Sequence, residues 1–191
     1  MFSLLAPHLH CDNVLQISAH YLRSLDRVGL LLDVDCTLKD YGDATIPEPV
    51  QEWLRSLRNA GISLCLLSNG KAKRIAPLAE SLGIPFIAKA FKPLPIGCRA
   101  ALRLIGLPAH RTAIVGDQLF ADIMAGKLAG LFTILVRPTT EVEPIWTRVK
   151  RPFERFVLRR IHSNGAGVPM KLQPSNVSVA TSSVVSGDAI N

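Results

Sequence analysis

The stretch "GLLLDVDCTLKDYGD", residues 29–43, indicates the fold because two aspartates follow directly behind a short apolar run. Residues 29–32 have the continuous hydrophobicity of a strand that is buried on both faces. Asp33 and Asp35 stand where this strand should end, and the polar residues after them are typical of a loop. A buried carboxylate costs free energy unless a cation or hydrogen bonds compensate it, so the end of this strand is the first candidate site.

The rest of the chain continues an alternation of strands and helices. Further strands are predicted at residues 62–69, 84–88, 112–117 and 132–138, and helices between them at 48–61, 71–83, 94–107 and 119–130. This order predicts an α/β protein with a Rossmann-like three-layer fold, in which a parallel sheet of about five strands carries helices on both faces.

The pattern also predicts how the chain is divided. Residues 29–145 form the expected catalytic core, and residues 1–28, with a helix from Ser18, form a leader that packs on it. Residues 146–162 form a basic amphipathic segment. The tail, residues 163–191, is rich in Ser, Gly and Val and nearly uncharged, so we expect it to be disordered.

Composition narrows the class of partner and compartment. The chain has 191 residues, 48% of them hydrophobic, and a formal net charge of +7, which favours an anionic partner such as acidic lipid, nucleic acid or a phosphorylated metabolite. Its 4 cysteines lack the spacing of a zinc site. The N-terminal sequence lacks the positively charged region with which a signal peptide begins. No apolar run approaches the roughly 20 residues that a membrane-spanning helix needs. We therefore expect a cytoplasmic protein, soluble or peripheral on a membrane.

Polar side chains recur where the predicted strands end. They are Asp33, Asp35 and Thr37 after the first strand, Ser68 and Asn69 at the second, Lys92 after the third, and Asp117 and Asp122 after the fourth. The carboxyl ends of parallel strands share one edge of the sheet, so these residues should meet. Clustered carboxylates without His or Cys favour Mg²⁺, and a lysine with hydroxyls suits a phosphoryl group. The set predicts phosphoryl transfer with an aspartate as nucleophile, although each residue alone is also an ordinary turn former or helix cap.

The same residues carry a family resemblance. "DVDCT", "LSNG", "KP" and "GDQLFAD" resemble, in order, the four motifs of the haloacid dehalogenase (HAD) superfamily. "SLGIPFIAKAFKP", "VGDQLFADIMAGKLAGLFTILV" and "WTRV" resemble the subfamily IIIA phosphatases of the YqeG type, a group that is similar to phosphatidylglycerophosphate phosphatases. The resemblance covers roughly residues 1–150.

The resemblance implies a role for each motif residue. Asp33 would attack phosphorus and become an aspartyl-phosphate, and Asp35 would act first as acid and then as base. The phosphate would be bound by Thr37, which also holds the loop, and by Ser68, Asn69 and Lys92. Mg²⁺ would be held by Asp33, Asp117 and the backbone carbonyl of Asp35, with Asp122 in support. Cys36 stands where family members usually carry Asn, a side chain that is not expected to do chemistry.

The choice of substrate depends on what surrounds the site. The interval between Asp35 and Ser68 is filled by one helix and one strand, which leaves no room for a cap domain, so an open site is expected. The basic, aromatic stretch of residues 146–160 predicts attraction to anionic lipid, with docking on the core as the alternative. We therefore predict hydrolysis of phosphatidylglycerophosphate to phosphatidylglycerol at the inner face of a membrane. The alternatives are a phosphatase of soluble sugar or nucleotide phosphates and a basic RNA- or ribosome-binding protein. The intact motifs argue against a purely non-catalytic protein, and we do not expect nucleic acid to be the partner.

Overall fold

The computed structural model describes residues 4–140 and the short strand Met170–Lys171. The predicted basic segment, residues 146–162, therefore lies outside the described residues, as does the predicted tail apart from that strand. In the described part of the chain, no helix is both long enough and apolar enough to cross a membrane.

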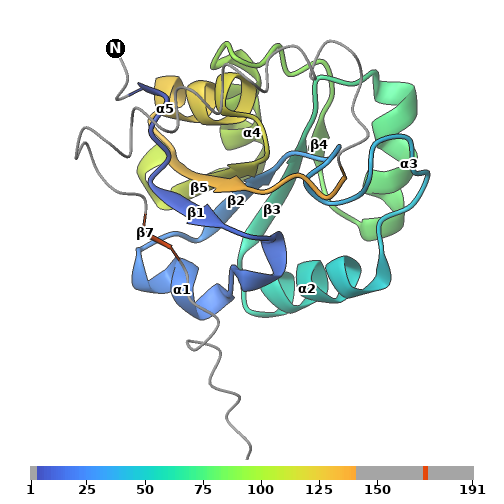
Figure 1. The fold of residues 1–191 in the computed structure, drawn as a ribbon, viewed down its shortest axis with the longest axis horizontal. Helices are drawn as coiled ribbons and strands as arrows, with labels where there is room; N and C mark the ends of the chain where they lie inside the picture. Colours follow the sequence, from blue (N-terminus) through green and yellow to red (C-terminus); the bar gives the residue numbers. More distant parts are fainter. Residues whose placement is uncertain (1–3, 141–169, 172–191) are drawn as a thin grey trace, which may run out of the picture.

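A parallel sheet forms the middle layer (Figure 1). Its strands, in chain order, are β1 (Leu9–Cys11), β2 (Gly29–Leu32), β3 (Ser63–Leu67), β4 (Phe86–Ile87), β5 (Thr112–Gly116), β6 (Phe132–Val136) and β7 (Met170–Lys171). Their order across the sheet is β4-β3-β2-β5-β6-β1-β7, and every pairing is parallel. The five predicted strands are present as β2 to β6, and the two short strands β1 and β7 add to the expected number.

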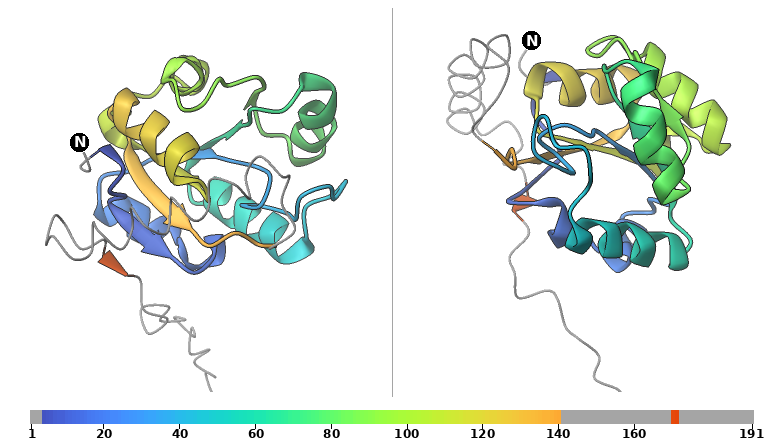
Figure 2. Two further views of the ribbon diagram at one scale, coloured as in Figure 1. Left: turned by 45° about the horizontal axis from the view of Figure 1, so that its top comes forward. Right: turned by 90° about the vertical axis from the view of Figure 1, so that its right-hand side faces the viewer.

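Helices cover both faces of this sheet, as predicted. They are α1 (Ala19–Ser24), α2 (Glu48–Asn59), α3 (Ala72–Leu82), α4 (Ile96–Ile105) and α5 (Met124–Ala129), with short turns η2 (Val14–Gln16), η3 (Ala109–Arg111) and η4 (Leu119–Ile123). Figures 1 and 2 show α1 and α2 on one side of the sheet, and α4 and α5 on the other. The Rossmann-like three-layer architecture is therefore confirmed.

The two faces follow from the alternation of side chains along β2. Leu30 and Leu32 belong to the core cluster beneath α1, α2 and α3, whereas Leu31 belongs to the cluster beneath α4 and α5. All three leucines are fully buried, which is why this strand reads as a continuous apolar run.

The N-terminal residues are tied to the core by hydrogen bonds and strand pairing. Ser18 Oγ accepts a hydrogen bond from the Tyr21 backbone N–H at 3.1 Å, so α1 begins where the sequence predicts. Trp53 of α2 donates from Nε1 to the Ile17 carbonyl at 2.7 Å. β1 pairs with β6, so this segment extends the sheet as well as packing on it.

The strand order places a crevice at the carboxyl end of β2. From β2 the chain moves to β3 and β4 on one side, and then crosses to β5 and β6 on the other. Such a reversal leaves a crevice between the two central strands, where ligands of α/β sheets bind. Asp33 follows β2, Ser68 follows β3 and Asp117 follows β5, so the register brings them to this crevice.

Candidate active site

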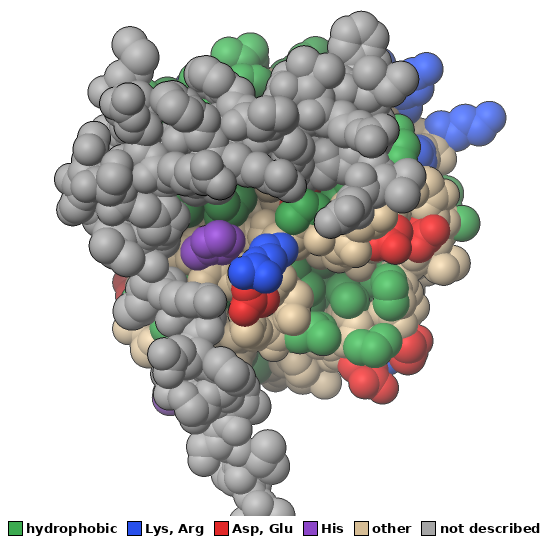
Figure 3. Space-filling view, viewed as in Figure 1, with side chains coloured by type: hydrophobic (Ala, Val, Ile, Leu, Met, Phe, Trp, Pro, Cys, Tyr) green, Lys and Arg blue, Asp and Glu red, His purple; other side chains and the backbone are tan. Residues whose placement is uncertain are grey.

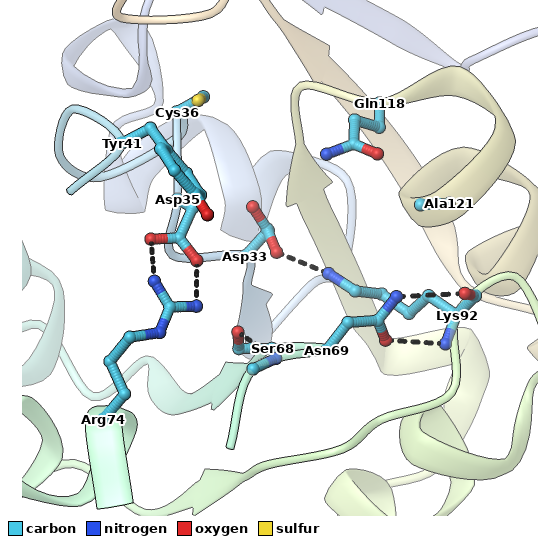
Figure 4. Close-up of a pocket in the computed structure, with 11 residues that line it drawn as sticks. Asp33, Asp35, Cys36, Tyr41, Ser68, Asn69, Arg74, Lys92, Gln118 and Ala121 are labelled. Carbon is cyan, nitrogen blue, oxygen red and sulfur yellow. Dashed lines mark hydrogen bonds and ion pairs between the residues drawn. The ribbon is translucent and has the colours of Figure 1, made fainter. Parts of the chain in front are cut away.

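A pocket of about 130 Å³ opens at the ends of β2, β3 and β5 (Figure 4). It is lined by Asp33, Asp35, Cys36, Tyr41, Ser68, Asn69, Gly70, Arg74, Lys92, Gln118 and Ala121. The predicted site residues outside this lining are Thr37, Asp117 and Asp122, which are buried beside it. The structure thus gathers all the predicted residues in one place, five of them facing the pocket.

Asp33, Lys92 and Asp122 form a buried ion cluster at the base of the site. Lys92 Nζ donates to Asp33 Oδ1 at 2.5 Å, to Asp122 Oδ1 at 2.6 Å and to the Leu67 carbonyl at 3.0 Å. The Lys92 side chain is only 2% exposed, so all its donors must be used inside the protein. The cluster therefore holds the ammonium against the carboxylate that lines the pocket.

Burial and mutual charge set the protonation of this cluster. Burial raises the pKa of Asp33 to about 7, with Lys92 opposing the rise and Asp122 adding to it. Burial also lowers the pKa of Lys92, but attraction to Asp122 and Asp33 outweighs it and leaves that pKa above its ordinary value. Lys92 is therefore held in its charged form, and its attraction opposes the effect that burial has on the pKa of Asp33.

Asp122 reaches the cluster because β5 ends in a glycine and the next turn is unusually wide. Residues 119–123 form a π-helical turn, a feature that is often found at functional sites. A Cβ atom at Gly116 would overlap the Asp122 carboxyl group. Asp122 Oδ2 accepts the Gln118 backbone N–H at 3.0 Å, which fixes the carboxylate.

Three buried carboxylates could hold a cation. One oxygen from each of Asp33, Asp117 and Asp122 lies within 4.8 Å of the others. Thr37 Oγ1 lies 3.4 Å from Asp117 Oδ1 and donates toward it, so this threonine contacts the acidic cluster instead of the pocket. Lys92 Nζ contacts two of these acids, Asp33 and Asp122, and hard oxygen ligands of this kind fit Mg²⁺.

Asp35 lies at the rim of the pocket in a different environment. Arg74 Nη1 and Nη2 donate to its two oxygens at 2.7 and 2.5 Å, and Lys39 Nζ donates to Oδ1 at 3.1 Å. Burial raises the pKa of Asp35, but the hydrogen bonds from Arg74 and Lys39 outweigh it and hold the pKa below its usual value. In Figure 4 the guanidinium of Arg74 faces the carboxylate of Asp35 as a fork.

Ser68 and Asn69 shape the backbone around the pocket. Asn69 Oδ1 accepts the Lys92 backbone N–H at 2.8 Å, and Asn69 Nδ2 donates to the Lys92 carbonyl at 3.0 Å. Ser68 Oγ accepts the Gly70 N–H at 3.0 Å. Asn69 therefore fixes the loop that aims Lys92 into the site, a contact that the sequence did not reveal.

Arg74 and Lys39 are the charged site residues that the sequence prediction missed. Arg74 lies in the first turn of α3, directly after β3, and so at the same edge of the sheet as the predicted residues. Its position directly after a predicted strand is the signal that could have indicated it. Lys39 lies four residues after Asp35 and is buried, which composition could not indicate.

The site is not covered by a cap within the described core. Between Asp35 and Lys92 the chain forms α2, β3, α3, β4 and their connections, with no further domain. The described core therefore has no cap domain in this interval, as the short spacing predicted.

The sequence is similar to known phosphatases. Residues 14–130 match the family model of haloacid dehalogenase-like hydrolases. The chain is 31% identical over 159 residues to a Bacillus subtilis (strain 168) protein described as "Probable phosphatase YqeG", covering 83% of this chain and 92% of that protein. It is 26% identical over 121 residues to a phosphoglycolate phosphatase of Pseudomonas fluorescens (strain Pf0-1), covering 56% of this chain and 44% of the relative.

A solved structure shares the fold. The HAD family hydrolase from Deinococcus radiodurans R1, determined with bound phosphate and sodium, aligns with a TM-score of 0.50 and 15% identity. The alignment covers 76% of this chain and 100% of that chain. At this identity the likeness concerns the architecture alone.

Proposed function

Because this chain belongs to the haloacid dehalogenase-like hydrolase family, we propose that it hydrolyses phosphate monoesters with Mg²⁺ through a phosphorylated Asp33. The observation that carries the proposal is the placement of Asp33. Its carboxylate lines the pocket, and Lys92 Nζ donates a hydrogen bond to its Oδ1 at 2.5 Å. A carboxylate in that position faces an incoming phosphoryl group, and the ammonium offsets the charge of the reacting oxygens.

Mg²⁺ fits the acidic cluster. Asp33, Asp117 and Asp122 bring three carboxylates together, and a divalent cation would be attracted to them. When bound, the ion would draw electron density from phosphoryl oxygens and so favour attack at phosphorus. Asp122, which already contacts Lys92 and the Gln118 N–H, would keep the cluster in position.

Asp35 is suited to proton transfer at the mouth of the pocket. Its carboxylate is ionised while Arg74 holds both oxygens, which is the form needed to take a proton from water. An incoming phosphate ester competes with Asp35 for the guanidinium of Arg74, because both line the pocket. Loss of that contact would raise the pKa of Asp35, which favours protonation before it donates to the leaving alkoxide.

We propose phosphatidylglycerophosphate as the substrate, dephosphorylated by a peripheral protein on an anionic membrane. The pocket of about 130 Å³ is smaller than the roughly 300–1,000 Å³ typical of sites that enclose a small molecule. It has room for a phosphoryl group, and the absence of a cap in the described core leaves the rest of a large substrate outside. A soluble phosphate ester is the second candidate, favoured by the partial similarity to phosphoglycolate phosphatases.

The experiment measures phosphate release from phosphatidylglycerophosphate in anionic micelles and from a panel of soluble esters, with Mg²⁺ or chelator. Wild type should prefer the lipid, and Asp33→Asn and chelator should each stop the reaction. Release of phosphate only from soluble esters would exclude the lipid as the substrate and leave the proposed mechanism in place. Release by Asp33→Asn at the wild-type rate would disprove the role of this aspartate.

A further inference from the structure

We propose that the loop of residues 89–96, which connects β4 to α4 and includes Ile96, the first residue of α4, is a docking surface for an anionic lipid bilayer. The inference rests on the lipid substrate proposed above and extends it to the way the protein meets its substrate. Figure 1 shows this connection crossing the top of the molecule from β4 to α4. Lys92, which lies within this loop, points inward to Asp33.

Three large apolar side chains of the loop face solvent. Phe91 is 62% exposed, Leu94 52% and Ile96 56%. The other exposed large hydrophobic residues of the described chain are dispersed through the sequence: Leu4, Leu15, Tyr41, Leu104 and Leu128. Single exposed hydrophobic residues are ordinary, whereas three within six positions, beside a catalytic pocket, are typical of a surface that contacts another apolar phase.

The backbone of the loop holds these side chains outward. Phe91 has φ of 56° and Lys89 φ of 48°, a left-handed conformation that residues with a Cβ rarely adopt. Hydrogen bonds from the Lys89 N–H to the Gly70 carbonyl and from the Ala90 N–H to the Ser68 carbonyl, at 2.9 and 3.0 Å, stabilise it. Ala90 and Lys92 are buried while Phe91 between them is exposed. The same backbone strain that aims Lys92 at Asp33 therefore displays Phe91 to solvent.

The charge around the loop selects an anionic surface. Lys71, Lys73, Lys89 and Arg99 are exposed, and none of them takes part in an ion pair within the described chain. Glu80 is the only acidic residue between positions 69 and 103. Figure 3 shows Lys and Arg side chains projecting over the N-terminal end of α3, with hydrophobic side chains beside them.

This combination fits a bilayer better than a second copy of the chain. Two copies that met through this surface would bring cations against cations, which opposes association. An anionic bilayer offers phosphate groups to the basic residues and an acyl layer to Phe91, Leu94 and Ile96. Docking there would bring the mouth of the pocket to the level of the lipid headgroups.

The test compares the full chain with two triple variants in sedimentation with vesicles. One variant carries Phe91→Ser, Leu94→Ser and Ile96→Ser. The matched control carries Leu15→Ser, Leu104→Ser and Leu128→Ser, which also remove exposed leucines. Vesicles consist of phosphatidylcholine alone or mixed with phosphatidylglycerol. Hydrolysis of a soluble ester and light scattering report folding and oligomeric state.

We expect wild type and control to bind the phosphatidylglycerol vesicles, and the loop variant to bind at least about tenfold more weakly with unchanged hydrolysis of the soluble ester. Equal vesicle binding by the loop variant and wild type would overturn the proposal, as would a wild type that ignores anionic vesicles. A dimer that the loop variant dissociates, without vesicle binding, would assign the surface to a second copy. Vesicle binding by a wild type that leaves phosphatidylglycerophosphate intact would support docking while removing the lipid as substrate.

Discussion

Asp33 and Asp35 belong to one loop, yet the protein places them in opposite electrostatic environments. Asp33 lies in the buried ion cluster with Lys92 and Asp122, where burial raises its pKa to about 7. Asp35 forms a rim ion pair with Arg74, whose side chain is 43% exposed, and cations there hold its pKa below the usual value. Two identical carboxyl groups thus acquire different chemistry from their neighbours alone.

The difference suits two distinct roles. A nucleophile gains from a fixed position beside an ammonium and away from water, which the buried ion cluster provides. A group that exchanges protons with water must remain accessible, which the rim allows. If this assignment holds, changes in the buried ion cluster should have large effects on both stability and turnover, and changes at the rim should have small effects on stability.

The largest effect is expected from replacing the two aspartates one at a time. Asp33→Asn should reduce kcat on the order of 10⁴-fold, because an amide cannot accept the phosphoryl group. Asp35→Asn should still form the phosphorylated protein from an aryl phosphate, whose leaving group needs no acid, but should hydrolyse it slowly. Intact-protein mass spectrometry after mixing would then show phosphoryl-protein in Asp35→Asn and none in Asp33→Asn. Labelling of Asp33→Asn would contradict the assignment.

Removal of the buried cation should cost the most stability. Lys92→Met leaves Asp33 and Asp122 without their shared partner, and we expect a loss of about 3 kcal/mol in the free energy of unfolding when a chelator is present. Mg²⁺ should restore part of this loss, since the cation takes over the compensation of charge. Urea unfolding with and without Mg²⁺ measures both the loss and its recovery, with Lys89→Met on the same loop as the control. A variant as stable as wild type in chelator would show that the buried ion cluster is not a structural requirement.

The sequence predicted the buried ion cluster better than the rim, and the reason is physical. Asp33, Lys92, Asp117 and Asp122 come after predicted strands, so the parallel order predicts that they gather at one edge of the sheet. The ion pairs of Lys92 also depend on the π-helical turn after β5 and on the loop that Asn69 fixes, which the sequence did not indicate. The contact of Arg74 with Asp35 depends on a side-chain conformation and on the small Gly70, which no periodicity encodes. Thr37 was expected at the phosphate, but its hydroxyl is directed to Asp117.

The strands were also predicted only where a local sequence pattern marks them. β2 to β6 could be predicted because each follows or precedes a recognisable helix. β1 has only three residues, and its pairing joins Leu9 to Ile134, far along the chain, so no local pattern marks it. Long-range pairing of short strands is decided by packing of the finished sheet.

A single added methyl group should distinguish the two environments. Gly116→Ala would press a Cβ atom into the Asp122 carboxyl group, inside a fully buried strand, and we expect a loss of about 2 kcal/mol with most of the turnover. Gly70→Ala would press on the end of the Arg74 side chain, which can move into solvent, so stability should change by less than about 0.5 kcal/mol. Thermal unfolding of both variants makes the comparison. Equal losses would mean that the rim is as rigid as the buried ion cluster.

The smallest effect is expected at the rim itself. Arg74→Gln removes an ion pair that solvent screens, so we expect a loss of no more than about 1 kcal/mol in the free energy of unfolding at pH 7.

The pH dependence of this loss follows from the direction of the pKa shift of Asp35. Because Arg74 lowers the pKa of Asp35 in the folded state, its stabilisation is fully present above the ordinary carboxyl pKa and is lost as pH falls through the lowered pKa of the folded protein. Unfolding of wild type and Arg74→Gln in chelator should therefore differ at pH 7, and the two stabilities should converge as pH falls through the lowered pKa of Asp35. Arg55→Gln breaks an exposed pair with Glu48, and neither residue lines the pocket, so it should show a smaller loss and leave turnover unchanged. If the Arg74→Gln difference persisted in acid strong enough to protonate Asp35, packing of the arginine side chain, and not its charge, would be what stabilises the rim.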